Sequence, residues 1–238
     1  MVKKDKDEKR EVATKIETMP ATATANFYEK YGQAAANRSH IGDILRFNKF
    51  GEYRYGKYDE ELPLGTVLAA YMVTFCTGWT LWQSNRPVEE IMGPVGEGFV
   101  PPVRSTLGHL DKTEWESFDD GREKDPWAFT NKIVLVDTKG AEPVFYTFST
   151  SSKGGIGALG ALALQYGEHL RQKPSESPLV GLGRDSYAHS NRSYGEIRVP
   201  VFGIVGWTPT AKLPPLPGWG AEHTKLLGDS PAAVSRNF

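Results

Sequence analysis

The sequence predicts a mainly β domain with a single helix, and three observations support this prediction. The 25 Gly and 16 Pro together make 41 of the 238 residues, an excess that favours many turns over long helices. Most apolar runs are short, rich in β-branched and aromatic residues, and bounded by turn-forming residues, as strands are. Only one segment, 156–171, repeats its apolar residues with the period of a helix.

Length and charge exclude several classes of protein. A chain of 238 residues can bury its own core and fold alone. Its 28 basic and 29 acidic residues give a net charge of −1, which excludes a histone-like polycation and an acidic solvating chain. The single cysteine, Cys76, excludes an internal disulfide framework and a zinc site built from cysteines.

We expect a cytoplasmic protein with no membrane partner. The charged segment 1–10 is not followed by the apolar stretch of a signal peptide. The best candidate for a membrane span, 64–82, is interrupted by threonines and glycines, so it predicts a long strand instead.

The chain is expected to divide into a folded middle and two extensions. Residues 1–40 mix basic and acidic side chains without a sustained period, which predicts a flexible N-terminal arm. Residues 209–238 begin with prolines and glycines and end in a polar tail, which predicts a disordered C-terminal extension. Residues 41–208 are predicted to form a single β-rich domain, in which the acidic stretch 93–126 is a long loop excursion.

Six strands are expected in the folded middle. The turn 137–140 joins two of them in a hairpin. Gly78 indicates a bulge in the longest strand, and Pro200 indicates an edge position or a bulge for the last one. The expected strands are Thr66–Trp82, Val88–Met92, Ala128–Val136, Val144–Ser149, Leu179–Leu182 and Tyr194–Trp207.

The order of these elements predicts an OB-like β-barrel. The amphipathic helix, 156–171, lies between the hairpin and the last two strands. Because no βαβ unit repeats along the chain, a mixed or antiparallel sheet is expected. An antiparallel barrel of five principal strands with one helix after the third is the arrangement of an OB-fold, which binds single strands through an exposed sheet face. The predicted strands exceed the minimal OB-fold by one or two.

Gly155, Gly157 and Gly160 form a G-x-G-x-x-G pattern between a predicted strand and the predicted helix. A dinucleotide-binding fold uses such a turn to bring phosphates to a helix N-terminus, and Asp185 lies near the distance expected for its ribose-binding acid. The chain after Asp185 is too short to supply the remaining strands of that fold. A flexible loop followed by close helix packing explains the same glycines.

No cofactor or metal site is expected. The five histidines lack the spacing of a zinc motif. The acidic residues within 111–125 are interleaved with basic ones and lack the spacing of a calcium loop, which favours a solvated loop. We therefore expect a protein that is not an enzyme.

Aromatic and cationic side chains alternate along several segments, most densely in 46–58. Stacking of bases on aromatic rings beside a cationic track gives sequence-tolerant single-strand binders roughly 1 to 3 kcal/mol per base. Burial in the core is the alternative explanation for each aromatic residue. The candidate stacking residues are Phe47, Tyr53, Tyr55, Trp79, Trp82, Trp127 and Phe148, and the candidate phosphate contacts are Arg46, Lys49, Arg54, Lys57, Lys132 and Lys153.

Segments 42–47, 125–127, 151–157 and 199–202, together with the hairpin, resemble a group of uncharacterised bacteriophage and prophage proteins. The order of strands and helix is also similar to that of phage single-stranded-DNA-binding proteins of the OB-fold type. This resemblance implies an accessory of DNA replication or recombination in the cytoplasm of a bacterial host cell. Such phage proteins usually end in an acidic tail, whereas this chain ends in Ser-Arg-Asn-Phe, which puts the mode of partner recruitment in doubt.

The leading functional hypothesis is a sequence-independent single-stranded DNA-binding protein, with single-stranded DNA and replication or recombination proteins as partners. Two alternatives stay open. One is a non-enzymatic phage structural or protein-interaction module, and the other is a nucleotide- or phosphate-binding enzyme that uses the loop Gly155–Gly160. The sequence leaves open the oligomeric state, the preference for DNA or RNA, and the role of 93–126.

Overall fold

The structure is a computed structural model that describes residues 40–118, 121–188, 190–191 and 195–217. Two predicted segments lie largely outside the described residues. They are residues 1–39 of the predicted N-terminal arm and residues 218–238 of the predicted C-terminal extension. Among the described residues, no helix is both long and apolar enough to cross a membrane.

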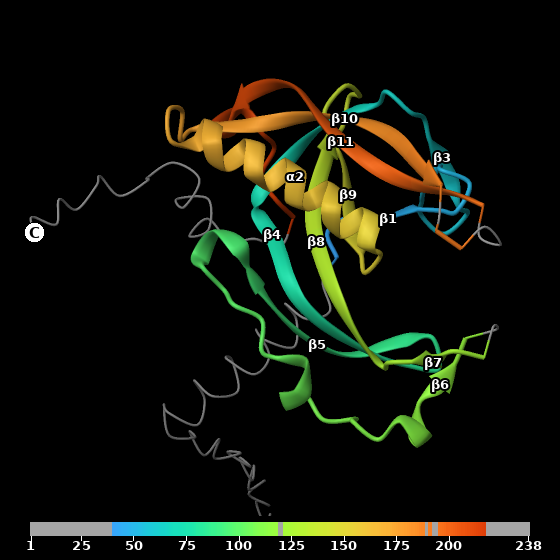
Figure 1. The fold of residues 1–238 in the computed structure, drawn as a ribbon. Helices are drawn as coiled ribbons and strands as arrows, with labels where there is room; N and C mark the ends of the chain where they lie inside the picture. The colour runs from blue at the N-terminus through green and yellow to red at the C-terminus, as the bar shows by residue number, and fades with distance from the viewer. Residues whose placement is uncertain (1–39, 119–120, 189, 192–194, 218–238) are drawn as a thin grey trace, which may run out of the picture. The chain divides into compact units, whose positions relative to one another are not determined.

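A curled, mixed sheet of nine strands has the outline of a half-barrel (Figure 1). Eight strands follow one another across it, and the ninth, β5 (Arg86–Pro94), pairs with the C-terminal half of β4. The order across the sheet is β11 (Glu196–Pro209), β10 (Glu176–Ala188), β4 (Val67–Gln83), β8 (Trp127–Asp137), β9 (Val144–Thr150), β1 (Asp43–Phe47), β2 (Tyr53–Tyr55) and β3 (Glu60–Leu62).

The predicted mainly β class is confirmed. The prediction of an antiparallel sheet is wrong for one pair of strands. Strands β1 and β9 run parallel, and every other pair of strands in the described residues is antiparallel. The pairing of β1 with β9 joins residues about 100 positions apart, such as Asp43 and Tyr146. Because local patterns specify hairpins and not such remote pairs, the sequence does not predict this parallel contact.

All six predicted strands are present, and most extend beyond their predicted ends. The predicted strand 179–182 is the centre of the 13-residue β10. Pro200 lies in β11, which forms one edge of the sheet, as expected for a proline in a strand. The sequence does not predict β1, β2 and β3, because strands of five, three and three residues are too short to show an alternation.

Gly78 is not the predicted bulge, because it pairs in register with both β5 and β8. A Cβ atom at this position would lie 2.0 Å from the backbone oxygen of Ile91. Glycine is therefore required by the close approach of β5. The register of β4 against β8 shifts instead between Tyr71 and Cys76.

The helix α2 (Lys153–Leu170) begins three residues before its predicted start. The side-chain oxygen of Ser152 accepts a hydrogen bond from the backbone N–H of Gly155 at 3.0 Å and caps the helix. Leu159 and Leu162 face the sheet and are fully buried. Figure 1 shows α2 beside β10 and β11, crossing in front of β4 and β8.

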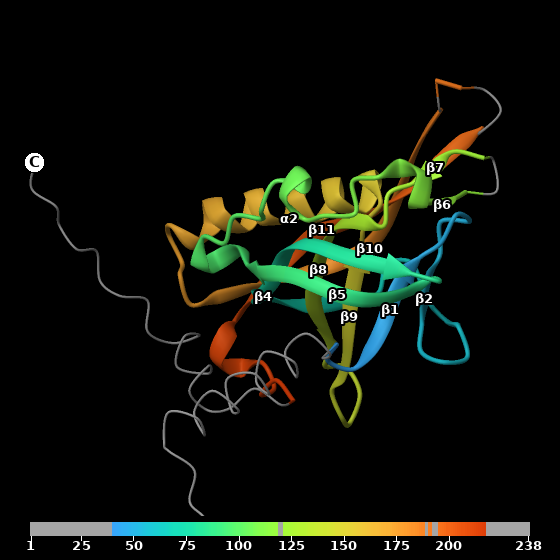
Figure 2. The same cartoon turned by 90° about the horizontal axis from the view of Figure 1, so that it is seen from below.

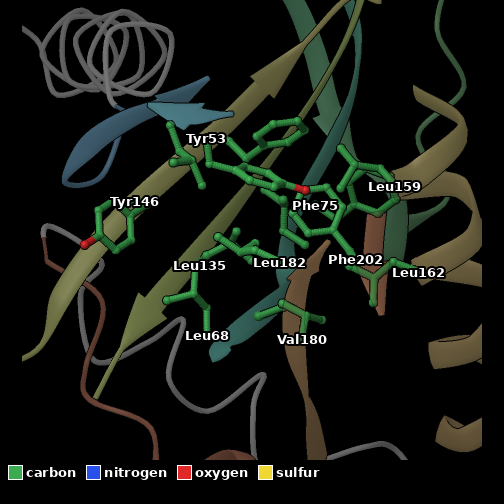
Figure 3. Close-up of a cluster of buried hydrophobic side chains, with 14 of the residues drawn as sticks. Tyr53, Leu68, Phe75, Leu135, Tyr146, Leu159, Leu162, Val180, Leu182 and Phe202 are labelled. Carbon is green, nitrogen blue, oxygen red and sulfur yellow. The ribbon is translucent and has the colours of Figure 1, made fainter. Parts of the chain in front are cut away.

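The main core fills the space between α2 and the concave face of the sheet (Figure 3). Its buried side chains come from β1, β2, β3, β4, β8, β9, β10, β11 and α2, so it joins almost every element. The largest fully buried members are Tyr53, Phe148, Leu45, Leu68, Ile133, Leu135, Leu159, Leu162 and Leu182.

A second cluster lies on the opposite face of the sheet, where Tyr71 and Val136 alternate with the core residues of β4 and β8. Leu213 and Leu216 pack against it, and the hydroxyl of Tyr71 donates to the backbone oxygen of Pro214. Residues 209–217 were expected to begin the C-terminal extension. They belong to the folded domain instead, because these apolar contacts hold them on the sheet.

The predicted loop excursion after β5 contains short elements and fixed contacts. The indole N–H of Trp79 donates to the backbone oxygen of Pro102 at 2.9 Å. Arg104 forms an ion pair with Asp125 at 2.7 Å, which joins an inner part of the excursion to its C-terminal end. Its short elements are η1 (Val95–Glu97), η2 (Arg104–Thr106), η3 (Lys112–Glu114), β6 (Glu116–Ser117) and β7 (Glu123–Lys124).

Tyr53 connects the two ends of the curled sheet. Its side chain is fully buried, and its hydroxyl donates to the backbone oxygens of Gly183 at 2.9 Å and Val201 at 3.2 Å. Strand β2 lies near one end of the sheet order, whereas β10 and β11 form the other end. Burial raises the pKa of the Tyr53 hydroxyl well above its usual value, so this group stays a donor at neutral pH.

We predict that Tyr53→Phe lowers the free energy of unfolding by about 1 to 2 kcal/mol, because it leaves two backbone acceptors without this donor. Urea denaturation of both proteins measures the change. The matched control is Tyr58→Phe, since Tyr58 is 79% exposed and should unfold at the wild-type midpoint. Equal midpoints for Tyr53→Phe and the wild type would show that the sheet does not depend on this contact.

Candidate nucleic-acid interface

Asn48 organises the turn between β1 and β2. Its side-chain oxygen accepts hydrogen bonds from the backbone N–H groups of Phe50 at 2.9 Å and Glu52 at 3.1 Å. Its amide donates to the carboxylate of Glu52 at 2.9 Å. Gly51 has a φ of 78°, a left-handed conformation that glycine adopts without strain. The result is an Asx-type turn with Lys49 and Phe50 exposed to solvent.

Two arginines of the β10–β11 hairpin lie against this turn. A Cβ atom at Gly51 would lie 2.7 Å from Cδ of Arg198 and 3.1 Å from Cδ of Arg184. Arg198 also donates from its guanidinium to the backbone oxygen of Phe50 at 2.7 Å. The fold therefore places two cations from the end of the chain beside a turn near its beginning. Both figures of the whole fold show the hairpin and β1 on the same side of the molecule (Figure 2).

Strands β1 and β2 add two further cations. Arg46 and Arg54 lie directly opposite each other in the register, on the face that alternates with the buried Leu45 and Tyr53. Arg54 forms ion pairs with two carboxylates, at 2.9 Å and 3.6 Å. Within the described residues, Arg46 has no carboxylate at ion-pair distance.

We name the resulting group of five side chains the basic end: Arg46, Lys49, Arg54, Arg184 and Arg198. Three carboxylates act on Arg54: Glu52 and Glu61 form ion pairs with it, and Asp59 lies close enough to raise its pKa, so five cations against three anions leave a net charge of +2. The whole chain has a net charge of −1. Like charges placed opposite each other on neighbouring strands destabilise a sheet, so this concentration of cations is not explained by folding.

Exposed aromatic rings accompany the basic end. Phe50 is 57% exposed, and Nζ of Lys49 lies 5.3 Å from the centre of its ring. Tyr58, in the connection between β2 and β3, is 79% exposed, with Nζ of Lys57 at 5.7 Å from its ring centre. Exposed rings beside cations are the combination that binds stacked bases.

Three predicted stacking residues are corrected by the structure. Tyr53, Trp127 and Phe148 are 0%, 4% and 1% exposed, so none of them offers a ring face to a base. Each points into the domain because alternate residues of a strand face the core. Burial in the core, the alternative to base stacking, therefore explains these three aromatic residues.

Two other predicted aromatic residues in 46–58 are half-buried. The ring of Phe47 packs edge-on against Tyr53 at 4.9 Å between centres. The ring of Tyr55 packs edge-on against Tyr146 at 5.1 Å, and its hydroxyl donates to Glu60 at 2.9 Å. Both rings support the turn that carries the basic end, and they leave only part of their surface to solvent.

The remaining predicted residues of β4 and β8 lie elsewhere. Trp79 and Trp82 are half-buried on the part of β4 that pairs with β5, and the loop excursion contacts Trp79 through Pro102. Lys132 forms an ion pair with Glu90 of β5. These residues do not join the basic end, since their contacts are with β5 and the loop excursion.

The glycine pattern does not have the geometry of a dinucleotide-binding turn. Lys153 is the first residue of α2, so all three glycines lie inside the helix instead of in a loop before it. A Cβ atom at Gly157 or Gly160 would meet no described atom within 4 Å beyond the helix backbone, so neither position brings α2 close to a strand. Lys153 itself is exposed at the helix N-terminus.

Sequence reasoning missed Phe50, Arg184 and Arg198. Phe50 lies within the dense segment 46–58, and its position in a turn after Asn48 is the signal that indicates exposure. Arg184 and Arg198 carry no local signal, because only the pairing of the β10–β11 hairpin and its contact with Gly51 bring them to the basic end.

Comparisons with protein-family models, with curated proteins and with solved structures found no match for this chain. Among the described residues, no group of three potential metal ligands lies together. The side chains of the basic end are of the kind that bind anions, with aromatic rings beside them.

The carboxyl group of Glu52 reports on the turn. Its pKa lies below the ordinary value of 4.5, chiefly because of the hydrogen bond from Asn48 and also because of the bond from Arg54. Because folding lowers this pKa, the contact stabilises the fold above pH 4.5 and is lost as the pH falls through the lower, folded value.

We predict that Asn48→Ala raises the pKa of Glu52 more than Arg54→Gln does, because the Asn48 hydrogen bond is the larger cause. NMR titration of the side-chain carboxyl carbon of Glu52 in the three proteins measures the midpoints. A Glu52 midpoint that both substitutions leave unchanged would exclude the described turn.

Proposed function

We propose that this protein binds single-stranded DNA without sequence preference, through the basic end. The observation that carries the proposal is the convergence of five cations and an exposed Phe50 from segments more than 100 residues apart. Arginine and lysine contact phosphates, and exposed rings stack on bases of any sequence.

We further propose that five strands form an OB-like core. Its support is the connectivity β4, β8, β9, α2, β10, β11, with β10 returning to pair with β4, because an OB-fold has five barrel strands and one helix after the third. Strands β1, β2 and β3 lie beyond β9, and Tyr53 of β2 reaches β10 and β11. In this arrangement they fill the gap that a minimal OB-fold closes by pairing its third and fifth strands.

The position of the basic end supports the same proposal. OB-folds bind oligonucleotides with the loops between strands 1 and 2 and between strands 4 and 5, together with the face of strands 2 and 3. The β10–β11 hairpin corresponds to strands 4 and 5, and it carries Arg184 and Arg198. Two of the five cations therefore lie on one of the segments that an OB-fold uses for binding.

The biological setting that we propose follows the resemblance of residues 42–202 to bacteriophage and prophage proteins. A protein that coats single strands without reading sequence serves as an accessory to DNA replication or recombination in the cytoplasm of the host. Binding of this kind needs no catalytic residue, since its free energy comes from phosphate contacts and stacking.

We predict that the double substitution Lys49→Gln and Arg184→Gln weakens binding of a 30-nucleotide poly-dT about tenfold at low salt. Two solvent-exposed ion pairs of about 0.7 kcal/mol each correspond to this factor. The slope of log affinity against log salt should become less steep by about 1.4, because about 0.7 counterions fewer are released for each lost phosphate contact. Fluorescence anisotropy over a range of salt concentrations measures both quantities.

The matched control is the double substitution Lys139→Gln and Lys212→Gln, which removes two exposed cations outside the basic end. It should leave the affinity within about twofold of the wild type. Equal losses in both double variants would indicate binding by overall charge alone. Absence of binding by the wild type at micromolar concentration and low salt would reject the proposed function.

Glu52→Gln should strengthen binding, because it removes the nearer of the two carboxylates that pair with Arg54 and makes that guanidinium more available to a phosphate. We expect an increase of about threefold at low salt, the equivalent of about 0.7 kcal/mol. The control is Glu142→Gln, an exposed residue outside the basic end. An unchanged or weaker affinity of Glu52→Gln would place Arg54 outside the binding surface.

A further inference from the structure

The solvent face of α2 is unusual for a surface helix. At about 100° per residue, six residues of α2 fall on one stripe, and all six are exposed. A surface helix normally carries polar and charged residues on this side. Here the middle of the stripe is apolar and small, and only its two ends are charged. The six residues are Lys153, Gly157, Gly160, Ala161, Leu164 and Glu168.

Leu164 stands out on this face because its side chain is 67% exposed. Gly160 lies one turn and Gly157 two turns from it toward the helix N-terminus, and neither has a side chain to cover it. A Cβ atom at Gly157 or Gly160 would meet no described atom within 4 Å beyond the helix backbone. Glycine weakens a helix relative to alanine, and no contact within the described residues requires it at these two positions. Packing of the single chain therefore does not explain the face.

We propose that this face is the interface of a homodimer, in which α2 packs antiparallel against α2 of a second copy. A two-fold axis between Gly160 and Ala161 places Leu164 of each copy opposite Gly157 of the other. The exposed leucine then fills the notch that the glycine leaves. Because the interface is two-fold symmetric, this contact occurs twice.

The charges at the two ends of the stripe fit the same register. The axis between Gly160 and Ala161 brings Lys153 of each copy opposite Glu168 of the other, so the pairing of opposite charges also occurs twice. Both side chains are exposed. Within the described residues, neither forms an ion pair in its own chain.

The self-complementarity of the stripe identifies a second copy as the occupant. When a second copy of the stripe is turned to run antiparallel to the first, Leu164 of each copy faces Gly157 of the other. Lys153 of each copy likewise faces Glu168 of the other. A parallel arrangement would instead set Leu164 against Leu164 and like charges against each other. A partner of different sequence would have no reason to share this centre of symmetry.

The dimer is expected to be weak, because two single helices bury less surface than a standard stable interface. We expect a dissociation constant on the order of micromolar. The stripe contains none of the five cations of the basic end, so dimerisation goes beyond the proposed function and each can be tested without the other.

Sedimentation equilibrium of the full chain, at protein concentrations from about 1 to 200 μM, tests the proposal. Leu164→Glu and Gly157→Leu should each weaken association at least about tenfold, since one removes the protruding side chain and the other fills the notch. Gly157→Leu should at the same time raise the midpoint of thermal unfolding at low concentration, because leucine is a better helix former than glycine. This separates loss of the interface from loss of the fold.

The control is Val88→Glu, an apolar-to-acidic change at a residue of β5 that is 53% exposed and lies outside the stripe. It should associate as the wild type does. A wild-type protein that is monomeric over the whole range would overturn the proposal. The same conclusion would follow if Leu164→Glu and Val88→Glu associated equally.

A charge exchange tests the register itself. Lys153→Glu and Glu168→Lys should each weaken association at least about threefold, because each places like charges opposite each other. The double variant should return to within about twofold of the wild type, because the exchanged charges again oppose each other across the interface. A double variant as weak as the single ones would exclude the antiparallel register centred on Gly160 and Ala161.

Discussion

The hydroxyl of Tyr53 holds together the two ends of a sheet that local pairing leaves open. Strands β4, β8 and β9 form a meander, and β10 and β11 form a hairpin, but within the described part of the chain no ladder joins β2 to either strand of that hairpin. One buried phenol supplies this connection through two backbone oxygens. Its ring also packs at 6.1 Å from that of Phe202, which links the connection to the main core.

The basic end depends on this connection. Gly51 can lie under the side chains of Arg184 and Arg198 only when β2 is held against β10 and β11. The turn between β1 and β2 is held in addition by the side chain of Asn48, which forms hydrogen bonds with the backbone of the turn and with the carboxylate of Glu52. Cations that repel one another are thus held in place by contacts that lie beneath them, and the carboxylates of Glu52 and Glu61 offset only part of their charge.

The sequence predicts what local chemistry determines. Period-two runs and the turn 137–140 identify β8 and β9, and a period of 3.6 identifies α2. In 46–58 the strands are too short to show which side chains face inward. The sequence therefore predicts one binding surface for Tyr53 and Arg54, whereas their alternation in β2 places them on opposite faces. The contact of Arg198 with Phe50 joins residues 148 positions apart, and no local pattern carries that information.

The parallel pair of β1 and β9 has a consequence for how the chain is made. During synthesis, β1 leaves the ribosome about 100 residues before its partner β9. The two residues whose backbone oxygens accept from Tyr53 follow it in the chain by 130 and 148 positions. The pairing of β1 with β9 and the hydrogen bonds of Tyr53 therefore cannot form until almost the whole domain has emerged. Contacts of such long range slow folding, and they leave the edge of β1 that later pairs with β9 unpaired in the meantime. The nascent chain is then most exposed to aggregation while β1, β2 and β3 are complete but β9 has not yet been made.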